Sequence, residues 1–443
     1  MFYANGKYHF FYQHRPNSCT FPRSRSEYKM HWGHAVSKDL LRWEDLPIAL
    51  FPDDKGDCWS GSCVVDKENL SGLGKNAVLA YYTNYVAEDG TQEQGLAYSS
   101  DYENFIKFPK NPVVPNPGQS DFRDPKVFWN PIRNCYSMAL TGGKHIEFYA
   151  SDDLLNWEKT GEFEAAKFGL DGICECPDCF PVKTDEGEKW VLITSVKTPK
   201  EEARQRCDAF DRVAFLVEYF VGEFDGDKFI NTEKSDKPLL LDFGTDFYGA
   251  VTFDGAEEKI TMGWASNWEF ARDFPTEDEG YRGAYTLPRK LSLVKTDKGY
   301  RIASSFVGLE SYKTEPLKSG ENVLSAETFG LRLKVSGEGS IKLSNENGEQ
   351  IVILAEKDKF TVDTTAAGLK AFSEIYSLDC IRKSTAEVLS DTPWDMEIVF
   401  DKSILEVIGD NGLAPITATV YPTLPYDKIT VLGDLTAEFY EIK

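Results

Sequence analysis

The sequence is poor in positive charge and has no long apolar run. Its 443 residues include 49 lysines and arginines against 72 aspartates and glutamates, which gives a formal net charge of −23. An acidic chain without a basic stripe is a poor nucleic-acid binder, and no segment reaches the roughly 20 apolar residues of a membrane-spanning helix. With 41% hydrophobic residues the chain can fill the cores of two or three domains, which excludes disorder. The expected partner is therefore neutral or small.

Cysteine is sparse and unevenly placed. The nine cysteines are an odd number spread along the chain, unlike the dense even framework of a small secreted protein. We therefore expect free thiols and a cytoplasmic location, while a secretion signal upstream of Met1 stays open. Cys174, Cys176 and Cys179 lie close together, but a zinc site needs a fourth ligand, and the nearest histidine in sequence is His145. No metal and no cofactor are predicted.

Short β-rich runs dominate the first 300 residues, and one pattern recurs among them. Ala35–Trp43, Ala97–Phe105 and Tyr149–Trp157 each hold a serine, an aspartate two residues later and an aromatic residue four further on, with a weaker echo ending at Phe229. The pattern also fits a strand that simply runs into a turn, but three matches in one register favour a repeat. A spacing a little above about 40 to 50 residues is typical of four-stranded blades with extra loop. Residues 1–300 are predicted to form a five-bladed β-propeller.

The repeat stops after residue 300, and the pattern changes. Leu331–Val335 alternates apolar with polar residues, Asn347-Gly348 marks a tight turn, and Met396–Phe400 and Ser403–Ile408 supply further strands. These features are typical of a β-sandwich. The prediction is an all-β chain with a propeller over 1–300, a linker over 301–322 and a C-terminal β-sandwich over 323–443.

Two carboxylates stand beside unusual neighbours. Asp124 follows a cation, Arg123, and precedes a proline that restricts the backbone, whereas Glu175 lies between two cysteines, which hydrate weakly and help to raise a carboxyl pKa. One protonated and one ionised carboxyl group are the minimum for cleaving a glycosidic bond. Among 72 acidic residues some such pair arises by chance, so the spacing alone does not select it. Four tryptophans near turns suit sugar stacking or a core equally well: Trp32, Trp59, Trp264 and Trp268.

Several ordered motifs together resemble glycoside hydrolase family 32, the β-fructofuranosidases and fructan hydrolases. They are Gly6–Gln13, Trp32–Leu40, Trp59–Ser62, Phe122–Lys126, Glu175–Asp178, Gly263-Trp264 and Thr286–Arg289, followed by Asp401–Val407 and Val420–Pro422. The resemblance covers nearly the whole chain. It implies a five-bladed propeller followed by a β-sandwich, in agreement with the repeat, and a carbohydrate substrate such as sucrose or a fructan.

The resemblance also implies roles for individual residues. Glu175 resembles the general acid/base, and Asp124 resembles the transition-state stabiliser that holds the fructosyl hydroxyls, with Arg123 beside it. The reaction of that family retains configuration: a carboxylate attacks the anomeric carbon, the acid protonates the leaving oxygen, and water then releases fructose. Further residues look like members of the fructose-binding pocket: Gln13, Trp59, Ser60 and Trp264.

One family motif does not occur in this sequence. The nucleophile of the family is the aspartate of an Asn-Asp-Pro-Asn-Gly motif that lies just before the strand corresponding to Phe2–Ala4, and the chain printed here begins at Met1. Our hypothesis is that Met1 is an internal methionine taken as the start. On that hypothesis this polypeptide lacks its nucleophile, and the alternative of another class is a catalytically silent fructan-binding protein.

The substrate stays open between two members of the enzyme class. Four cations near the expected mouth of the pocket, at Arg15, Arg23, Arg25 and Lys29, could hold the phosphate of a sucrose 6-phosphate hydrolase or belong to an ordinary solvated loop. Conversely, Gly263–Trp268 followed by Pro275-Thr276 looks more like the fructan-cleaving members. The longer match favours sucrose or levan and inulin type fructans. The charged segment Pro199–Arg212 is expected to add a loop on the leaving-group side.

Extending the chain upstream tests the start hypothesis. A polypeptide that includes the genomic codons preceding Met1 is expected to hydrolyse fructans orders of magnitude faster than the chain that begins at Met1, because the covalent route needs an attacking carboxylate. Fructose release by the two polypeptides is compared at equal concentration. Equal rates contradict the hypothesis.

Overall fold

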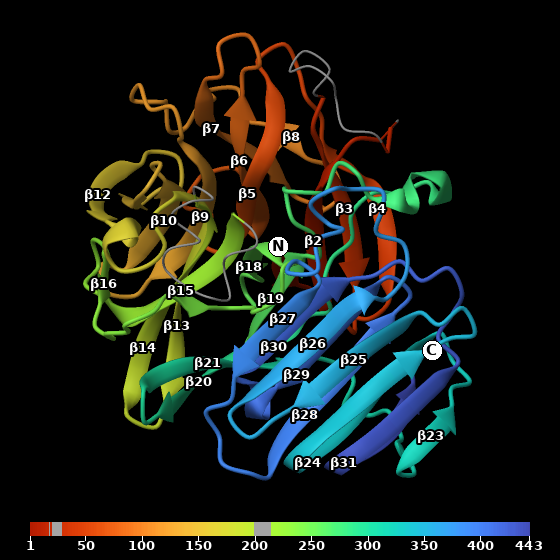
Figure 1. Ribbon diagram of the computed structural model, residues 1–443. Helices are drawn as coiled ribbons and strands as arrows, with labels where there is room; N and C mark the ends of the chain where they lie inside the picture. The colour runs from red at the N-terminus through yellow and green to blue at the C-terminus, as the bar shows by residue number, and fades with distance from the viewer. Residues whose placement is uncertain (17, 20–28, 199–213) are drawn as a thin grey trace. The chain divides into compact units, whose positions relative to one another are not determined.

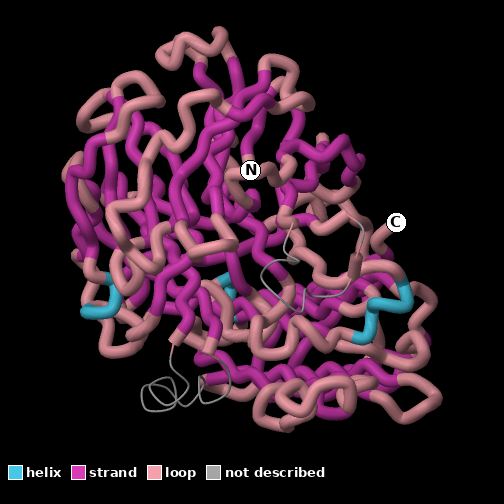
Figure 2. Tube along the Cα trace, turned by 90° about the horizontal axis from the view of Figure 1, so that it is seen from above, coloured by secondary structure: helices cyan, strands magenta, loops and turns pink. Residues whose placement is uncertain are grey.

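Almost every regular element of the protein is a β-strand, as predicted (Figures 1 and 2). The computed structural model describes residues 1–16, 18, 19, 29–198 and 214–443. The helical elements within these ranges are short 3-10 turns: η2 (Ala165–Lys167), η3 (Pro275–Glu279) and η4 (Asp410–Gly412). In the described part of the chain, no helix has the length and apolar character needed to cross a membrane.

Five sheets of consecutive strands form the blades of a five-bladed propeller (Figure 1), which confirms the predicted fold class. Blade 1 contains β1 (Phe2–Ala4), β2 (Lys7–His14), β3 (His31–Ser37) and β4 (Trp43–Leu50); blade 2 contains β5 (Asp57–Asp66), β6 (Ala77–Tyr85), β7 (Gln92–Ser99) and β8 (Ile106–Lys107). Blade 3 contains β9 (Arg123–Asn130), β10 (Cys135–Thr141), β11 (Ile146–Ser151) and β12 (Glu158–Phe163). Blade 4 contains β13 (Ile173–Thr184), β14 (Gly187–Lys197), β15 (Phe215–Phe224), β16 (Phe229–Asn231) and β17 (Leu239–Leu240), and blade 5 contains β18 (Tyr248–Thr252), β19 (Lys259–Trp264), β20 (Arg289–Thr296) and β21 (Gly299–Phe306).

The sequence repeat is the turn between the third and fourth strands of a blade. In blade 1, Asp39 Oδ1 accepts hydrogen bonds from the backbone N–H groups of Leu41 and Arg42, and Leu40 between them has a φ of +66°. A short carboxylate that bonds backbone groups two and three residues on is the ordinary way an aspartate fixes a turn. The same two hydrogen bonds recur in blades 2, 3 and 4, at Asp101, Asp153 and Asp225. The weak echo before Phe229 therefore forms the same turn, with Glu223 in place of the serine.

The C-terminal strands form one large sheet that folds over as a β-sandwich. Its members are β22 (Glu315–Pro316), β23 (Gly320–Val323), β24 (Thr328–Ser344), β25 (Gln350–Ala355), β26 (Lys359–Ala366), β27 (Lys383–Glu387), β28 (Trp394–Asp401), β29 (Ile404–Gly409), β30 (Ala414–Thr419) and β31 (Lys428–Glu441). The long strand β24 pairs with β28 through its first half and with β25 through its second half, with a register shift against β31 between Val335 and Gly339. Such a bulge lets one strand serve both layers of a sandwich.

By residue contacts the chain divides into two units. The first comprises Met1–Pro199, Glu218–Leu239 and Gly249–Thr261, and the second comprises Lys200–Val217, Leu240–Tyr248 and Met262–Lys443. Blades 1 to 3 lie within the first unit and the sandwich within the second. The predicted linker 301–322 begins inside β21 of blade 5, and it contains β22 and the start of β23, which both pair with β31. The domain boundaries at 300 and 323 stay a prediction.

A buried ion network explains one of the sequence motifs in the second unit. Arg289, the last residue of Thr286–Arg289, donates to Asp242 Oδ2 at 2.7 Å, to Glu406 Oε2 at 2.6 Å and to Thr417 Oγ1 at 2.6 Å. The Arg289 side chain is 1% exposed, and its carboxylate partners are 1% and 3% exposed. A buried guanidinium needs such partners, so the motif arginine ties β20 to the sandwich strands β29 and β30.

Two histidines lie inside blade 1 and are held as neutral rings. His9 Nδ1 and His34 Nε2 are 3.1 Å apart, and the two side chains stack on Phe2 and Phe11. Burial lowers the pKa of His9 from 6.5 to about 4 and that of His34 to about 3, with the charges of Lys7 and the Met1 amine adding to the shift for His9. Both rings therefore resist protonation at neutral pH.

This pair is expected to make the fold acid-labile. Because the folded pKa values lie below 6.5, the two rings contribute stability that is present above pH 6.5 and lost as the pH falls toward 4. The double substitution His9→Phe/His34→Phe keeps aromatic packing and is expected to move the acid unfolding midpoint to lower pH, measured by circular dichroism. His145→Phe is the matched control, since hydrogen bonding to Glu147 raises the pKa of His145. An unchanged midpoint in the double variant contradicts the prediction.

Candidate active site

Trp59, Ser60, Asp124 and Glu175 lie in or beside irregularities of the first strands of three neighbouring blades. The register of β5 shifts between Cys58 and Gly61, which leaves Trp59 and Ser60 out of the ladder. The register of β9 shifts between Arg123 and Lys126, around Asp124, and that of β13 shifts between Glu175 and Asp178. A bulge turns side chains out of the alternating pattern of a strand. The three motifs thus present their side chains in ways that regular strands could not.

Two of these irregularities have the same local cause. Asp124 has a φ of +63° and Cys176 a φ of +48°, and each residue precedes a proline, Pro125 or Pro177. Proline has no N–H group to give to a ladder, and it is tolerated inside sheets at bulges. A left-handed conformation in a residue that is neither glycine nor asparagine costs of order 1–3 kcal/mol, and such strain persists where surrounding contacts enforce it.

Arg123 holds three carboxylates around one guanidinium. Its Nη1 donates to Asp121 Oδ1 at 2.6 Å, its Nη2 donates to Glu175 Oε1 at 3.1 Å, and its Nε lies 3.9 Å from Asp124 Oδ2. The Arg123 side chain is 9% exposed, and that of Glu175 is 21% exposed. The structure thus brings the predicted acid, the predicted stabiliser and the predicted arginine together, with the Glu175 side chain partly exposed.

Asp124 is the most enclosed member of this group. Its Oδ2 accepts a hydrogen bond from the Cys176 N–H at 2.9 Å, and the Cys176 thiol lies 3.7 Å away. Burial raises the pKa of Asp124 from 3.8 to about 6; Arg123 opposes this shift and Glu175 adds to it. The strand carrying the predicted acid therefore also supplies a donor to the predicted stabiliser.

Hydrogen bonds and ring stacking within the first unit fix the positions of three predicted pocket residues, Gln13, Trp59 and Ser60. Gln13 Nε2 donates to Cys58 O at 3.2 Å, just before the β5 bulge. The ring of Trp59 stacks on Tyr85 with centroids 3.8 Å apart and planes 12° apart, so Tyr85 covers one face of the indole. Ser60 offers its carbonyl oxygen to Thr83 Oγ1 at 3.1 Å.

Trp264 belongs to the second unit, at the end of β19. There its ring lies 4.8 Å from that of Trp268, which is 41% exposed, and its backbone bridges to Tyr285. Its membership of the fructose pocket stays a prediction. Two further expectations, on Arg23 with Arg25 and on the loop Pro199–Arg212, lie outside the described residues.

The last residue of the Glu175–Asp178 motif is structural. Asp178 Oδ2 accepts hydrogen bonds from the N–H and the hydroxyl of Thr252, at 2.6 and 2.7 Å, and lies 3.2 Å from the ammonium group of Lys126. Both charged side chains are nearly inaccessible, at 1% and 7% exposed. Asp178 and Lys126 thus join β9, β13 and β18 next to the site. The sequence pattern alone could not show that Asp178 has a structural role and not a catalytic one.

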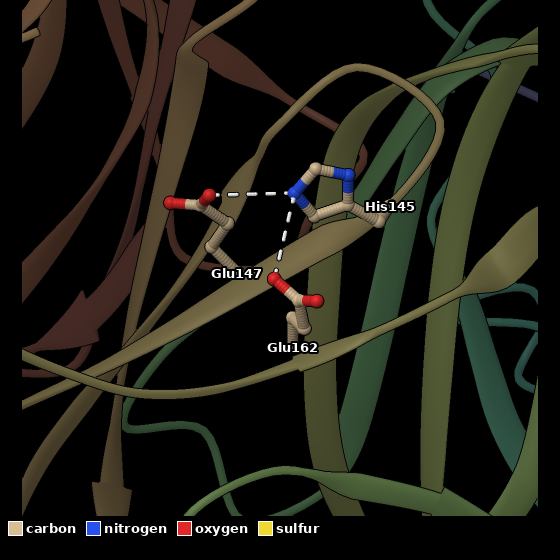
Figure 3. Close-up of side chains that lie close together, drawn as sticks. All are labelled: His145, Glu147 and Glu162. Carbon is tan, nitrogen blue, oxygen red and sulfur yellow. Dashed lines mark hydrogen bonds and ion pairs between the residues drawn. The ribbon is translucent and has the colours of Figure 1, made fainter. Parts of the chain in front are cut away.

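One cluster of possible metal ligands was not predicted from the sequence. Figure 3 shows His145, Glu147 and Glu162 pointing toward one another on blade 3. The ammonium group of Lys159 lies 2.7 Å from Glu147 Oε1 and 3.3 Å from Glu162 Oε2, so a cation of the protein already pairs with both carboxylates. We assign the cluster no metal. The described cysteines, Cys174, Cys176 and Cys179 among them, are free thiols.

Two family descriptions match nearly the whole chain: "Glycosyl hydrolases family 32 N-terminal domain" over residues 1–304 and "Glycosyl hydrolases family 32 C terminal" over residues 268–441. A levanase of Bacillus subtilis (strain 168) is 34% identical over 464 residues, which cover 95% of this chain and 64% of the levanase. A levanbiose-producing levanase of the same organism is 34% identical over 470 residues, which cover 99% of this chain and 86% of that protein. The crystal structure of exo-inulinase from Aspergillus awamori superposes with a TM-score of 0.87 at 26% identity, over 100% of this chain and 94% of that chain. The protein belongs to glycoside hydrolase family 32.

The raised pKa of Asp124 predicts a conflict between stability and function. A group whose folded pKa is about 6 against 3.8 contributes stability below pH 3.8 that is lost as the pH rises through 6. Asp124→Asn is therefore expected to unfold at higher urea concentration than the wild type at pH 7.5, by up to about 3 kcal/mol, and to lose this advantage near pH 4.

Asp101→Asn serves as the control for this prediction. Hydrogen bonds from Asn104 and its neighbours lower the pKa of Asp101, so its substitution is expected to give no stabilisation at pH 7.5. The same urea titrations measure both variants. An Asp124→Asn protein that is less stable than the wild type at pH 7.5 refutes the argument.

Proposed function

We propose that this chain is a retaining β-fructofuranosidase that releases fructosyl units from levan or inulin type fructans and from sucrose. The observation that carries the proposal is the arrangement around Arg123, where Glu175 and Asp124 come from adjacent first strands and meet at one guanidinium. Family membership supports the chemistry, and the levanase and exo-inulinase relatives support the fructan substrate. Carboxyl groups in different surroundings are what retaining glycoside cleavage requires.

Each residue of the arrangement has a step in the proposed reaction. Asp124, enclosed and bonded to the Cys176 N–H, accepts hydrogen bonds from hydroxyl groups of the fructosyl ring, and Arg123 balances its charge. Glu175, whose side chain is partly exposed, protonates the leaving oxygen and then activates the water that releases fructose. Trp59, backed by Tyr85, offers a flat face to the sugar. The attacking carboxylate is expected from the Asn-Asp-Pro-Asn-Gly motif of the family.

The alternatives differ in support. The sucrose 6-phosphate alternative depends on the cations between Arg15 and Lys29, of which Arg23 and Arg25 lie outside the described residues. The relatives named above act on fructans by their descriptions. In the other alternative, the protein binds fructans in the same pocket but does not hydrolyse them. Calorimetry with levan and inulin oligomers separates this reading from hydrolysis, because binding without fructose release favours it. A cytoplasmic location stays a prediction.

Substituting Glu175 in the polypeptide extended upstream of Met1 tests the proposed acid. Glu175→Gln keeps the shape of the side chain and a donor and acceptor near Arg123 but cannot transfer the proton. Fructose release from levan is expected to fall by about 10²- to 10⁴-fold, while the affinity for fructose in calorimetry stays within a few-fold.

Glu188→Gln is the matched control, because Glu188 lies at the start of β14, beside the turn that joins β13 to β14, and is exposed. It is expected to keep wild-type turnover. Unaltered turnover in Glu175→Gln removes Glu175 from the acid role. A fall in turnover with an equal loss of fructose affinity assigns it to binding instead.

A further inference from the structure

Two glutamines of β7 bind the segment that carries Arg123 and Asp124. Gln92 Nε2 donates to Ser120 O at 3.1 Å, and Gln92 Oε1 accepts the N–H of Phe122 at 3.0 Å. Gln94 Nε2 donates to Phe122 O at 2.8 Å. The backbone of Ser120 and Phe122 is thus hydrogen-bonded by the side chains of Gln92 and Gln94, which lie two residues apart on β7. Because such residues share one face of a strand, the two amides act as a substitute for a neighbouring strand.

A threonine of β6 continues this contact to Asp124. The N–H of Asp124, turned out of the ladder by the left-handed φ, donates to Thr83 Oγ1 at 2.8 Å. The Thr83 hydroxyl lies 3.1 Å from Ser60 O and 3.2 Å from Gln94 Oε1, and its single proton can go to one of them at a time. Thr83 therefore links the bulge of β5 with the bulge of β9.

The same set of side chains reaches the guanidinium. Arg123 Nη1 donates to Gln92 Oε1 at 3.1 Å as well as to Asp121. Thr83 and Gln94 are 0% exposed and directly opposite each other in the ladder between β6 and β7, and Gln92 is 7% exposed. Amide and hydroxyl groups so deeply buried are costly unless each hydrogen bond is made, so their geometry is fixed.

We propose that Thr83, Gln92 and Gln94 are positioning residues that hold Asp124 and Arg123 in the geometry needed to bind the fructosyl unit. Without the Thr83 hydroxyl, the left-handed conformation of Asp124 loses the acceptor of its N–H, and the carboxylate moves away from Cys176 and Arg123. Displacement of a binding group by about 1 Å can cost up to about 10²-fold in rate. The inference rests on the proposed function, since it assigns these residues to the same site.

Thr83→Val and Thr83→Ser, both made in the polypeptide extended upstream of Met1, form the decisive pair. Valine keeps the branched shape in the strand and removes the hydroxyl, whereas serine keeps the hydroxyl. We expect Thr83→Val to lower kcat/KM on levan by about 10- to 100-fold, to weaken fructose binding in calorimetry, and to speed hydrogen exchange at the Asp124 N–H. We expect Thr83→Ser to stay within a few-fold of the wild type in all three measurements.

Thr361→Val is the matched control for a purely structural loss. Thr361 is also a buried strand threonine, 7% exposed, with its hydroxyl 3.0 Å from that of Thr385 in the sandwich. All variants are assayed well below their own unfolding temperatures. Equal losses in Thr83→Val and Thr361→Val, or wild-type kcat/KM and fructose affinity in Thr83→Val, overturn the proposal.

A second variant keeps the proposal testable if Thr83→Val does not fold. Gln94→Met keeps the length of the side chain, removes the donor to Phe122 O and the acceptor of Thr83, and is expected to show the same losses. Measurements on the wild type separate failure of the proposed function from failure of the positioning role of Thr83. A wild type that neither binds nor cleaves fructans refutes the proposed function, while faster exchange at the Asp124 N–H in Thr83→Val still supports the positioning contact and unchanged exchange refutes it.

Discussion

The site depends on one buried guanidinium that must satisfy three carboxylates. Arg123 bonds Asp121 and Glu175 directly and lies 3.9 Å from the enclosed Asp124. The carboxylates of Asp124 and Glu175 repel each other in a low dielectric, and the guanidinium beside both of them offsets part of this repulsion. The raised pKa of Asp124 shows that the compensation is incomplete, because burial outweighs the cation. Keeping Asp124 ionised at neutral pH therefore lowers the free energy of unfolding.

The propeller supplies the frame for this guanidinium. Its first strands bulge at Trp59-Ser60, at Asp124 and at Cys176, and prolines remove ladder donors at two of these positions. Below the bulges the Lys126–Asp178 pair joins three first strands, and beside them Thr83, Gln92 and Gln94 replace missing backbone partners. Strain at the site is thus held in place by buried polar contacts on every side.

Much of this could be predicted from the sequence, for physical reasons. The Ser-x-Asp repeat is a local turn whose hydrogen bonds stay within a few residues, so it reveals the blades directly. The family resemblance named Asp124, Glu175 and Arg123, and the structure brings these three side chains together, while their catalytic roles stay a prediction. Thr83, Gln92 and Gln94 lie in strands of ordinary composition, and their partners are 28 to 41 residues away, so no local pattern shows them. The structural role of Asp178 was hidden for the same reason, since Thr252 is 74 residues distant.

The most direct test of the central claim is a crystal structure of the protein with fructose or a short levan oligomer bound. The arrangement around Arg123 predicts a fructosyl ring whose hydroxyl groups bond the Asp124 carboxylate, whose glycosidic or anomeric oxygen lies within hydrogen-bond reach of Glu175, and whose face lies against Trp59. A sugar bound with no contact to Asp124 or Glu175 contradicts the assignment of the site.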